Sequence, residues 1–516
     1  MKQVFNILIV LLLCLPTFVL AQNNENPVCG TEFTPEMKAR LIENIETAKS
    51  LNLSSSSSRT TQYIKVKFHL VANNDGTGRI SQAKVFEALC ALNQNFADQD
   101  VIFYLEGIYE MDNTIVNTHS NPAGAAVQMS IRKNQHNNAM NVFVCSSVNS
   151  GSGTPGTTLG YYSPNHDILV LRSNQINATS VTFTHEAGHF FSLPHPFLGW
   201  ESTDYHANYS ASNPPPTTVM WGNTTHNVEL ADGSNCATAG DLFCDTQADY
   251  NLGFGWGNCN YSNGAVDPTG ALVDPDETLY MGYFLDGNCQ NTFSTEQKGA
   301  VAADIARFGR SYLRGTPSTT VQVASVANLT APANNATTQF YDEVFLNWDA
   351  VADANQYYIE VNRFQNFSLN GKIDEVMVTN NSYLLTGLSA NTTYYWRVKA
   401  FNEVSSCAGF SSTRQFRTSS FPVSTSGKLK TTEIKLEPNF ASEGQIVNLN
   451  IQTKEKIDAT IRIINLNGQI LKDENLTLQS GTHIHSVSTE GLSSGVYIVN
   501  LQTAKGQINE RLVITN

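Results

Sequence analysis

Three histidines and a glutamate form a closely spaced group, in which the motif His-Glu-Ala-Gly-His at residues 185–189 is followed by His195. On a helix, side chains four residues apart lie on the same face, so His185 and His189 can bind one metal ion. His195 lies beyond that helix, so the chain must turn sharply to bring the third imidazole back. Three neutral imidazoles leave one tetrahedral position open, which is typical of catalytic zinc. Glu186 would face a water at that position and remove its proton as the general base.

The competing interpretation of this motif is a core helix whose polar side chains are satisfied internally. An apolar helix has little reason to carry three imidazoles and a carboxylate on one side, because each buried polar group costs free energy unless it is paired. The sequence therefore predicts a zinc site, and the surrounding elements must bring its ligands together.

The residues on either side of the motif predict an α/β region followed by loops. Strands are predicted from Tyr63 to Leu70 and over 101–104, 141–144 and 168–171, with helices over 34–48, 85–96 and 295–312. The stretch from Trp200 to Tyr280 is dominated by loops. Four cysteines lie in or near it, and we expect them to form two disulfides whose connectivity the sequence leaves open: Cys236, Cys244, Cys259 and Cys289.

Length and composition restrict the class of protein. A chain of 516 residues should contain about three domains, and 41% hydrophobic residues suffice for buried cores. The charged fraction of 15% is low for a cytosolic protein. The net charge is -14 and no cluster of Lys and Arg is present, so we expect no nucleic acid partner.

The N-terminus predicts export. A basic start, an apolar run and Ala21 indicate a secretory signal peptide over residues 1–21. A membrane anchor is disfavoured because Pro16 interrupts the run, which is shorter than about 20 residues, and no later segment could span a bilayer. The serine run over 54–58 and Arg59 indicate a processing site that would end a propeptide over 22–59, and a plain spacer fits equally well.

Beyond residue 314 the composition shifts to Ser, Thr, Val and Asn, with short alternating strands that predict two all-β modules. The first, residues 326–419, resembles a fibronectin type III sandwich through segments such as Tyr394–Ala400. The second, residues 433–516, resembles the C-terminal sorting domain of the bacterial type IX secretion system through its closing segment 491–499. That resemblance implies the type IX secretion machinery as a partner, and one more adhesive β-domain is the alternative.

The histidine motif and three later segments resemble the metzincin zinc peptidases, and among them the pappalysin branch with its ulilysin-type, cytophagalysin-like enzymes. The segments are Gly240–Thr246, Tyr280–Tyr283 and Cys289–Gln297, and the resemblance covers about residues 29–312. It implies a catalytic domain over 60–313, in which a mixed sheet with helices lies above an irregular lower subdomain.

The resemblance also assigns roles to two residues after the loops. Met281 would be the Met-turn residue, an apolar floor beneath the metal. Tyr283 would donate its hydroxyl to the developing oxyanion as a second catalytic residue. Both could also be ordinary core residues.

This chain departs from the family pattern at several positions. Ser192 stands where metzincins usually have glycine, at a turn that needs a left-handed backbone and where serine costs about 1 kcal/mol. Leu279 and Gln247 stand where relatives tend to have asparagine and proline, and one extra residue separates Met281 from Cys289. These changes weaken what the resemblance implies about the substrate pocket more than what it implies about the metal.

The resemblance implies a thiol switch at the start of the propeptide. The segment 29–31, Cys-Gly-Thr, matches one in which a thiolate can occupy the fourth zinc position and keep the zymogen inactive. The alternative is a disulfide between Cys29 and one of Cys90, Cys145 or Cys407.

The resemblance also implies a calcium site in the loops after the histidines. Asp241, Asp245 and Thr246 supply the hard oxygens that calcium needs. Solvated loop acids are the alternative.

Taken together, the sequence predicts a multidomain secreted zinc endopeptidase, with an α/β metzincin-type domain followed by two all-β sandwiches, that hydrolyses extracellular proteins or peptides. The alternative is a surface adhesin with a non-catalytic metalloprotease-like scaffold, and the retained Glu186 argues against it. A zinc hydrolase of small amides is disfavoured by the propeptide-like N-terminus. Cleavage preference stays open: Asp286 lies where relatives that cut beside basic residues carry an acid, but out of register, and self-processing at Arg59 is a hypothesis.

Overall fold

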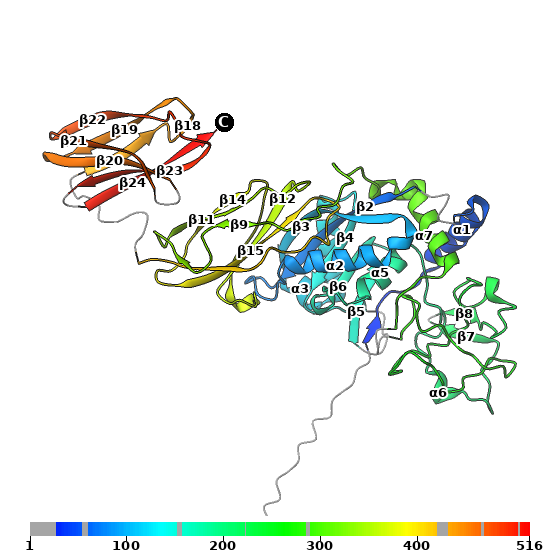
Figure 1. Ribbon diagram of the computed structural model, residues 1–516. Coiled ribbons are helices and arrows are strands. Elements are labelled where there is room, and N and C mark those ends of the chain that lie inside the picture. The colour runs from blue at the N-terminus through cyan, green and yellow to red at the C-terminus, as the bar shows by residue number, and fades with distance from the viewer. Residues whose placement is uncertain are drawn as a thin grey trace, which may run out of the picture.

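The computed structural model describes residues 27–53, 60–151, 157–221, 223–284, 289–420, 432–465, 469–503 and 506–515. The expected signal peptide, the 54–59 linker and Asp286 lie outside these residues. The described chain forms an α/β region with an irregular lower part, followed by two all-β sandwiches (Figure 1). Within the described ranges, no helix has both the length and the apolar character needed to cross a membrane.

A six-stranded sheet forms the centre of the α/β region, in the order β1-β5-β6-β4-β2-β3. Strands β2, β3, β4 and β6 are parallel, β5 is antiparallel to β6, and β1 joins β5 in parallel as the edge strand. The central strands are buried along most of their length, as parallel strands covered on both faces must be. The strands are β1 (Pro27–Cys29), β2 (Gln62–Ala72), β3 (Val101–Asp112), β4 (Met140–Cys145), β5 (Thr157–Ser163) and β6 (Ile168–Arg172).

Helices cover both faces of this sheet (Figure 1). Apolar residues of α2 and α5 pack on one face, and those of α3 and α4 pack on the other. Helix α1 lies against α7 beside the sheet. The helices are α1 (Pro35–Leu51), α2 (Ala83–Asn95), α3 (Thr114–Thr118), α4 (Pro122–Gln135), α5 (Thr182–Phe190), α6 (Tyr205–Asn208) and α7 (Thr295–Ala306).

The helix predicted over 295–312 is shorter in the structure. It ends at Ala306 because the next residue, Arg307, has an extended backbone with ψ of 144°, and a 3-10 segment follows over Phe308–Leu313. Helix α4 was not predicted, although its start is marked by Pro122 and by Asn121, whose side chain accepts from the backbone.

The lower part of the α/β region is mostly irregular and has its own apolar core. Its short elements are α6 and the hairpin of β7 (Thr218–Trp221) and β8 (Thr224–Asn227). Two disulfides tie this part together, Cys236–Cys244 and Cys259–Cys289. The four cysteines expected to be cross-linked are therefore paired with near neighbours in the sequence.

The middle sandwich, residues 329–417, packs a three-stranded sheet against a five-stranded sheet around Trp348 and Trp396. It is joined to the α/β region, because Tyr358 and Phe401 belong to the core that contains α2 and α5. A disulfide between Cys90 and Cys407 adds a covalent link. Its strands are β9 (Leu329–Ala331), β10 (Ala336–Thr337), β11 (Glu343–Trp348), β12 (Gln356–Asn362), β13 (Lys372–Val378), β14 (Ser382–Thr386), β15 (Thr393–Phe401) and β16 (Arg414–Arg417).

The C-terminal sandwich, residues 432–515, has a separate core made by its own two sheets. Apolar residues alternate along β20, so that one face enters the core and the other meets solvent. The strands are β17 (Thr432–Glu437), β18 (Phe440–Ser442), β19 (Ile446–Thr453), β20 (Ile457–Asn465), β21 (Ile470–Leu478), β22 (Gly481–Ser488), β23 (Gly495–Thr503) and β24 (Gly506–Thr515).

Candidate metal centre

Helix α5 carries the first two histidines and the glutamate of the motif, and every residue of the helix is buried. Its apolar side chains Phe183, Ala187 and Phe190 belong to the core beneath the sheet. His185 and His189, four residues apart, share another face, as the helical period requires. The helix therefore uses one side for packing and presents the other to the site.

The chain turns sharply after α5, as the position of the third histidine requires. The turn is closed by a bond from Leu193 N to Gly188 O at 3.0 Å. Ser192 occupies it with φ of 75°, the left-handed conformation that glycine adopts most easily. The turn forms with serine at this position, and His195 lies beside its two partners.

The Nε2 atoms of the three histidines converge on one point. They lie 3.1 Å apart for His185 and His189, 3.2 Å for His189 and His195, and 3.3 Å for His185 and His195. Two nitrogens bound at 2.0–2.1 Å to one tetrahedral ion lie roughly 3.3–3.4 Å apart. The separations therefore fit a shared ion.

The outer nitrogens of the rings fix which way each imidazole faces. His185 Nδ1 lies 2.7 Å from Tyr280 O, and His189 Nδ1 lies 2.8 Å from Leu193 O. A carbonyl oxygen only accepts, so both Nδ1 atoms must carry the hydrogen and both Nε2 atoms must present lone pairs. Burial also lowers the pKa of His185 and of His195 to about 3, so both are neutral near pH 7. Two lone pairs that face the same point are an arrangement that a metal ion could occupy.

The third histidine has a different outer partner, which the sequence did not suggest. His195 Nδ1 faces Glu201 Oε1 at 3.4 Å, and the second oxygen of Glu201 accepts from Gly199 N at 2.8 Å. Phe197 stacks on the His195 ring at 4.5 Å. A carboxylate behind a metal-binding imidazole orients the ring and increases its basicity.

A cysteine from the N-terminal segment completes the group. Cys29 Sγ and one nitrogen from each histidine all lie within 4.8 Å of one another, and all four residues are buried. Cys29 is not in a disulfide, since Cys407 is bonded to Cys90 and Cys145 has a free thiol. The alternative of a disulfide at Cys29 is therefore wrong.

The same segment contacts the glutamate of the motif. Glu186 Oε2 accepts from the Cys29 thiol at 3.4 Å and from Thr31 Oγ1 at 2.9 Å. Glu186 Oε1 is buried without a hydrogen-bond partner among the described residues. Burial raises the pKa of Glu186 to about 7, and the bonds from Cys29 and Thr31 only partly offset this effect. The carboxylate is therefore poised to exchange a proton near neutral pH.

Tyr283 and Met281 both lie close to the histidine motif. The Tyr283 hydroxyl accepts from Cys29 N at 2.9 Å and donates to Cys29 O at 3.3 Å, so it reaches the site beside the thiol. Met281 is fully buried, and a Cβ at Gly188 would lie 2.3 Å from its sulfur. Glycine at 188 thus allows the methionine to pack directly beneath α5.

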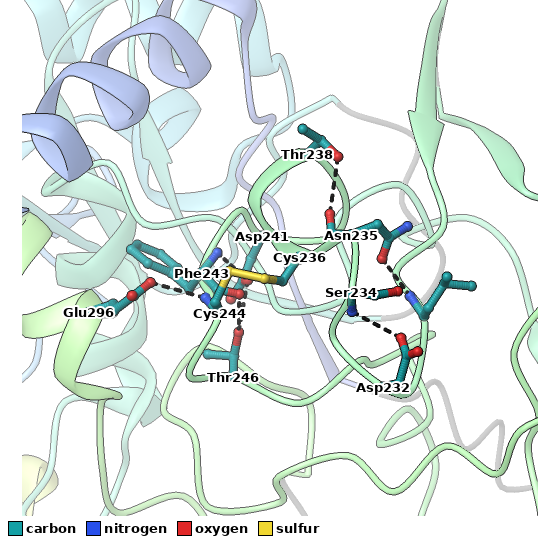
Figure 2. The surroundings of a disulfide bond; sticks show 11 residues. Asp232, Ser234, Asn235, Cys236, Thr238, Asp241, Phe243, Cys244, Thr246 and Glu296 are labelled. Carbon is teal, nitrogen blue, oxygen red and sulfur yellow. Dashed lines mark hydrogen bonds between the residues drawn. A yellow bond between two sulfur atoms is a disulfide. The ribbon is translucent and has the colours of Figure 1, made fainter.

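The acids expected to bind calcium are only partly together. Asp241 is buried, and its Oδ1 accepts from Thr246 Oγ1 at 2.9 Å (Figure 2). Asp245 instead points to the start of α7, where it accepts from Ser294 Oγ and from Glu296 N. Asp245 and the preceding Cys244 are both exposed. Figure 2 shows the disulfide that joins Cys244 to Cys236.

Glu229 is a second buried acid in this part of the chain, and Asp241 acts on it electrostatically. Burial raises the pKa of Glu229 to about 9, with a further contribution from Asp241 and Asp249. Burial raises the pKa of Asp241 to about 8. Glu229 Oε2 and Asp241 Oδ2 are each buried without a hydrogen-bond partner among the described residues. A hard cation such as calcium would stabilise the charged forms of such buried carboxylates.

Comparisons with known proteins agree with an exported chain. Residues 444–515 match the secretion system C-terminal sorting domain. An extracellular metalloprotease of Colletotrichum graminicola (strain M1.001 / M2 / FGSC 10212) is 27% identical over 212 residues, which cover 38% of this chain and 73% of that protein.

Solved structures of sandwich domains are similar to parts of the chain. Fibronectin domains FN1–FN3 of chicken CNTN1 are 11% identical, with a TM-score of 0.18, and cover 39% of this chain and 67% of that chain. The structure of FN3tt is 20% identical, with a TM-score of 0.14, and covers 19% of this chain and 98% of that chain.

The sorting domain and the extracellular metalloprotease relative have a common consequence. The protein carries a C-terminal sorting domain of the type IX secretion system, and it is secreted or displayed at the cell surface.

Proposed function

We propose that this protein is a zinc-dependent endopeptidase of the metzincin kind, whose ligands are His185, His189 and His195. The observation that carries the proposal is the convergence of three Nε2 lone pairs within 3.3 Å of one another. The similarity to an extracellular metalloprotease and the buried His and Cys group support it. The pappalysin-type domain over 60–313 and a fibronectin type III-like domain over 326–419 are parts of the same proposal.

The chemistry follows from the positions of the chain's own groups. A bound zinc ion would supply Lewis acidity toward water and toward the scissile carbonyl. Glu186 takes a proton and later gives it to the leaving amine, a task that suits a carboxyl whose pKa is raised to about 7. Tyr283 places a phenolic donor beside the position that Cys29 occupies, where the carbonyl oxygen of a substrate would gain charge.

The described chain supports the proposal that the N-terminal segment keeps the enzyme latent. Strand β1 pairs with β5, which would be the edge of the sheet without it and where an extended peptide substrate would then bind. The Cys29 thiol then lies beside the histidines, and the Thr31 hydroxyl donates to Glu186. The backbone of Cys29 contacts the Tyr283 hydroxyl. One short segment therefore covers the metal, the base and the oxyanion donor.

We also propose a calcium ion in the lower part of the α/β region. Its ligands would include Glu229 and Asp241, whose free carboxylate oxygens are buried. Thr246 would act through Asp241, to which it donates, and Asp245 would stabilise the start of α7. A cation there would remove the repulsion among buried acids.

The test is proteolysis by the exported, processed protein with and without Glu186→Gln. We expect casein cleavage by the parent to stop when a zinc chelator is added and to return with zinc. The Glu186→Gln variant should retain one equivalent of zinc and lose at least about 1,000-fold in kcat/KM. A variant that still cleaves casein at the parental rate would contradict the assignment. A parent that binds no zinc and cleaves nothing would favour the adhesin alternative.

A further inference from the structure

Helix α1 contacts the turn that connects the second and third histidines. Asn44 Nδ2 donates to Ser192 Oγ at 2.8 Å and to Asp304 Oδ1 at 3.0 Å. Its Oδ1 accepts from Arg307 at 3.3 Å, so both ends of the amide are held. Asn44 and Ser192 are 1% and 0% exposed. The contact is therefore fixed and shielded from water.

Ser192 needs such a partner more than most serines do. Its φ of 75° lies in a region that residues with a Cβ rarely adopt, because the side chain crowds the backbone. The turn cannot relax without a cost to the site, since His189 Nδ1 bonds to Leu193 O immediately after it. The same turn determines where the chain leaves toward His195. A side chain that holds Ser192 thus acts on two histidines.

A second residue of α1 contacts the end of the helix that carries the histidines. Arg40 is one helical turn before Asn44, and its guanidinium donates to Phe190 O at 3.0 Å. Phe190 is the last residue of α5. Two polar side chains on one face of α1 therefore hold the point where α5 ends, but only Asn44 contacts Ser192.

We infer that Asn44 is a positioning residue for the metal centre, which keeps Ser192 in its left-handed conformation and thereby places His195. The inference rests on the metal site proposed above and extends it to a segment predicted to be removed on maturation. The N-terminal segment then has a second role besides latency: it holds the turn while the three ligands assemble. A glycine at 192, as in relatives, would make that help unnecessary.

The experiment compares zinc affinity in full-length chains that all carry Glu186→Gln, so that no self-cleavage occurs. Asn44→Ala should weaken zinc binding about five- to tenfold, as the cost of an unsupported left-handed residue implies. It should also shift the visible absorption bands of the cobalt-substituted chain, which report ligand geometry. Adding Ser192→Gly to Asn44→Ala should restore both readouts to within about twofold of the parent, since glycine adopts this φ unaided.

Two matched controls separate positioning from general packing. Ser192→Ala keeps the Cβ but loses the hydroxyl, so it should behave like Asn44→Ala, and combining the two should add little. Arg40→Ala removes the contacts of α1 with Phe190 O and with Asp304 but leaves the bond from Asn44 to Ser192 in place, so Ser192→Gly should not restore it. If Asn44→Ala lowers the yield of folded chain, Asn44→Ser is the milder change with the same expected rescue.

Three results would overturn the inference. The first is an Asn44→Ala chain that binds zinc as tightly as the parent and has the same cobalt spectrum. The second is an Arg40→Ala chain that Ser192→Gly restores as fully as it restores Asn44→Ala. A parent chain that binds neither zinc nor cobalt would overturn the proposed metal site itself, and the inference with it.

Discussion

The Thr31 hydroxyl donates a hydrogen bond of 2.9 Å to the Glu186 carboxylate. The same hydroxyl accepts from Tyr162 N at 2.8 Å, and Thr31 N donates to Cys29 Sγ at 3.2 Å. One residue of the N-terminal segment thus links the proposed general base, strand β5 and the thiol. Latency should therefore depend on Thr31 as well as on Cys29.

The first prediction concerns this link. Thr31→Val has nearly the same size but removes the shorter of the two hydrogen bonds to Glu186 Oε2, so the unprocessed chain should gain roughly tenfold in basal peptide hydrolysis. Cys29→Ala should gain more, because it also frees the position beside the histidines. Initial rates on a quenched fluorescent casein measure both, in a chain with Arg59→Ala to retain the segment. Thr31→Ser, which keeps the hydroxyl, is the control. If the Thr31→Val chain hydrolyses casein no faster than the unprocessed parent, latency depends on the Cys29 thiol and not on Thr31.

A second prediction concerns Glu201, which faces His195 Nδ1 at 3.4 Å. Burial raises the pKa of Glu201 to about 8, and the zinc ion proposed above would favour its charged form. Glu201→Gln keeps an oxygen for Gly199 N but cannot carry that charge behind the imidazole. Zinc affinity should fall about tenfold, as for other carboxylates behind metal-binding histidines. Competition with a chromophoric chelator measures the affinity, and circular dichroism checks that the fold is retained. Unchanged zinc affinity would mean that Glu201 contributes to packing but does not support the metal ligand His195.

The features that were predicted best from the sequence are those that depend on residues close together in the chain. His185 and His189 share a face because they are four residues apart, and the strand beginning at Tyr63 followed from simple alternation. The contacts that complete the site come from distant segments. Asn44 and Ser192 are 148 residues apart, and Thr31 and Glu186 are 155 residues apart.

Such long-range contacts depend on how α1 and β1 pack against the folded sheet, and no local sequence pattern specifies that packing.

For the same reason the sequence did not identify which acids lie near each other in the lower part of the α/β region. Asp245 lies in the sequence segment that resembles the family, but Glu229, sixteen residues before it, is the acid whose buried oxygen lies near Asp241. The closing helix was predicted too long because its break at Arg307 is a backbone change without a proline or a capping glycine.

A third prediction concerns pH and calcium. Burial raises the pKa of Glu229 to about 9 and of Asp241 to about 8, whereas both ionise near pH 4 when unfolded. The calcium-free folded state therefore holds protons that the unfolded state has lost, and the free energy of unfolding should fall as pH rises from about 4 to about 9. Calcium should flatten this slope and raise Tm most at the alkaline end.

Thermal unfolding in calcium and in a calcium chelator, at intervals from pH 5 to pH 9, measures this effect. Glu229→Gln should remove much of the slope and much of the calcium response. Asp245→Asn is the matched control: it should lower Tm by weakening the start of α7, yet leave the calcium shift intact. Equal loss of the calcium shift in both variants would argue that the cation binds at the surface.

The last prediction concerns the interface between the middle sandwich and the α/β region. The Phe86 ring lies 5.5 Å from that of Tyr358 and 4.9 Å from that of Phe401, within one core. The disulfide Cys90–Cys407 closes a sequence separation of 317 residues. Because apolar packing and a covalent link both cross this boundary, the two parts should unfold in one calorimetric transition, with the C-terminal sandwich melting separately.

Replacing Cys90 and Cys407 with alanine should lower stability by about 2–5 kcal/mol but leave that transition single, since the aromatic contacts remain. Phe86→Ala should cost about 3–5 kcal/mol and, in the chain without the disulfide, split the transition in two. Removal of the short-range disulfide Cys236–Cys244 is the control, because it crosses no such boundary. If the parent chain already melts in separate steps for the two parts, the interface does not couple them, and residues 326–419 would behave as an appended module.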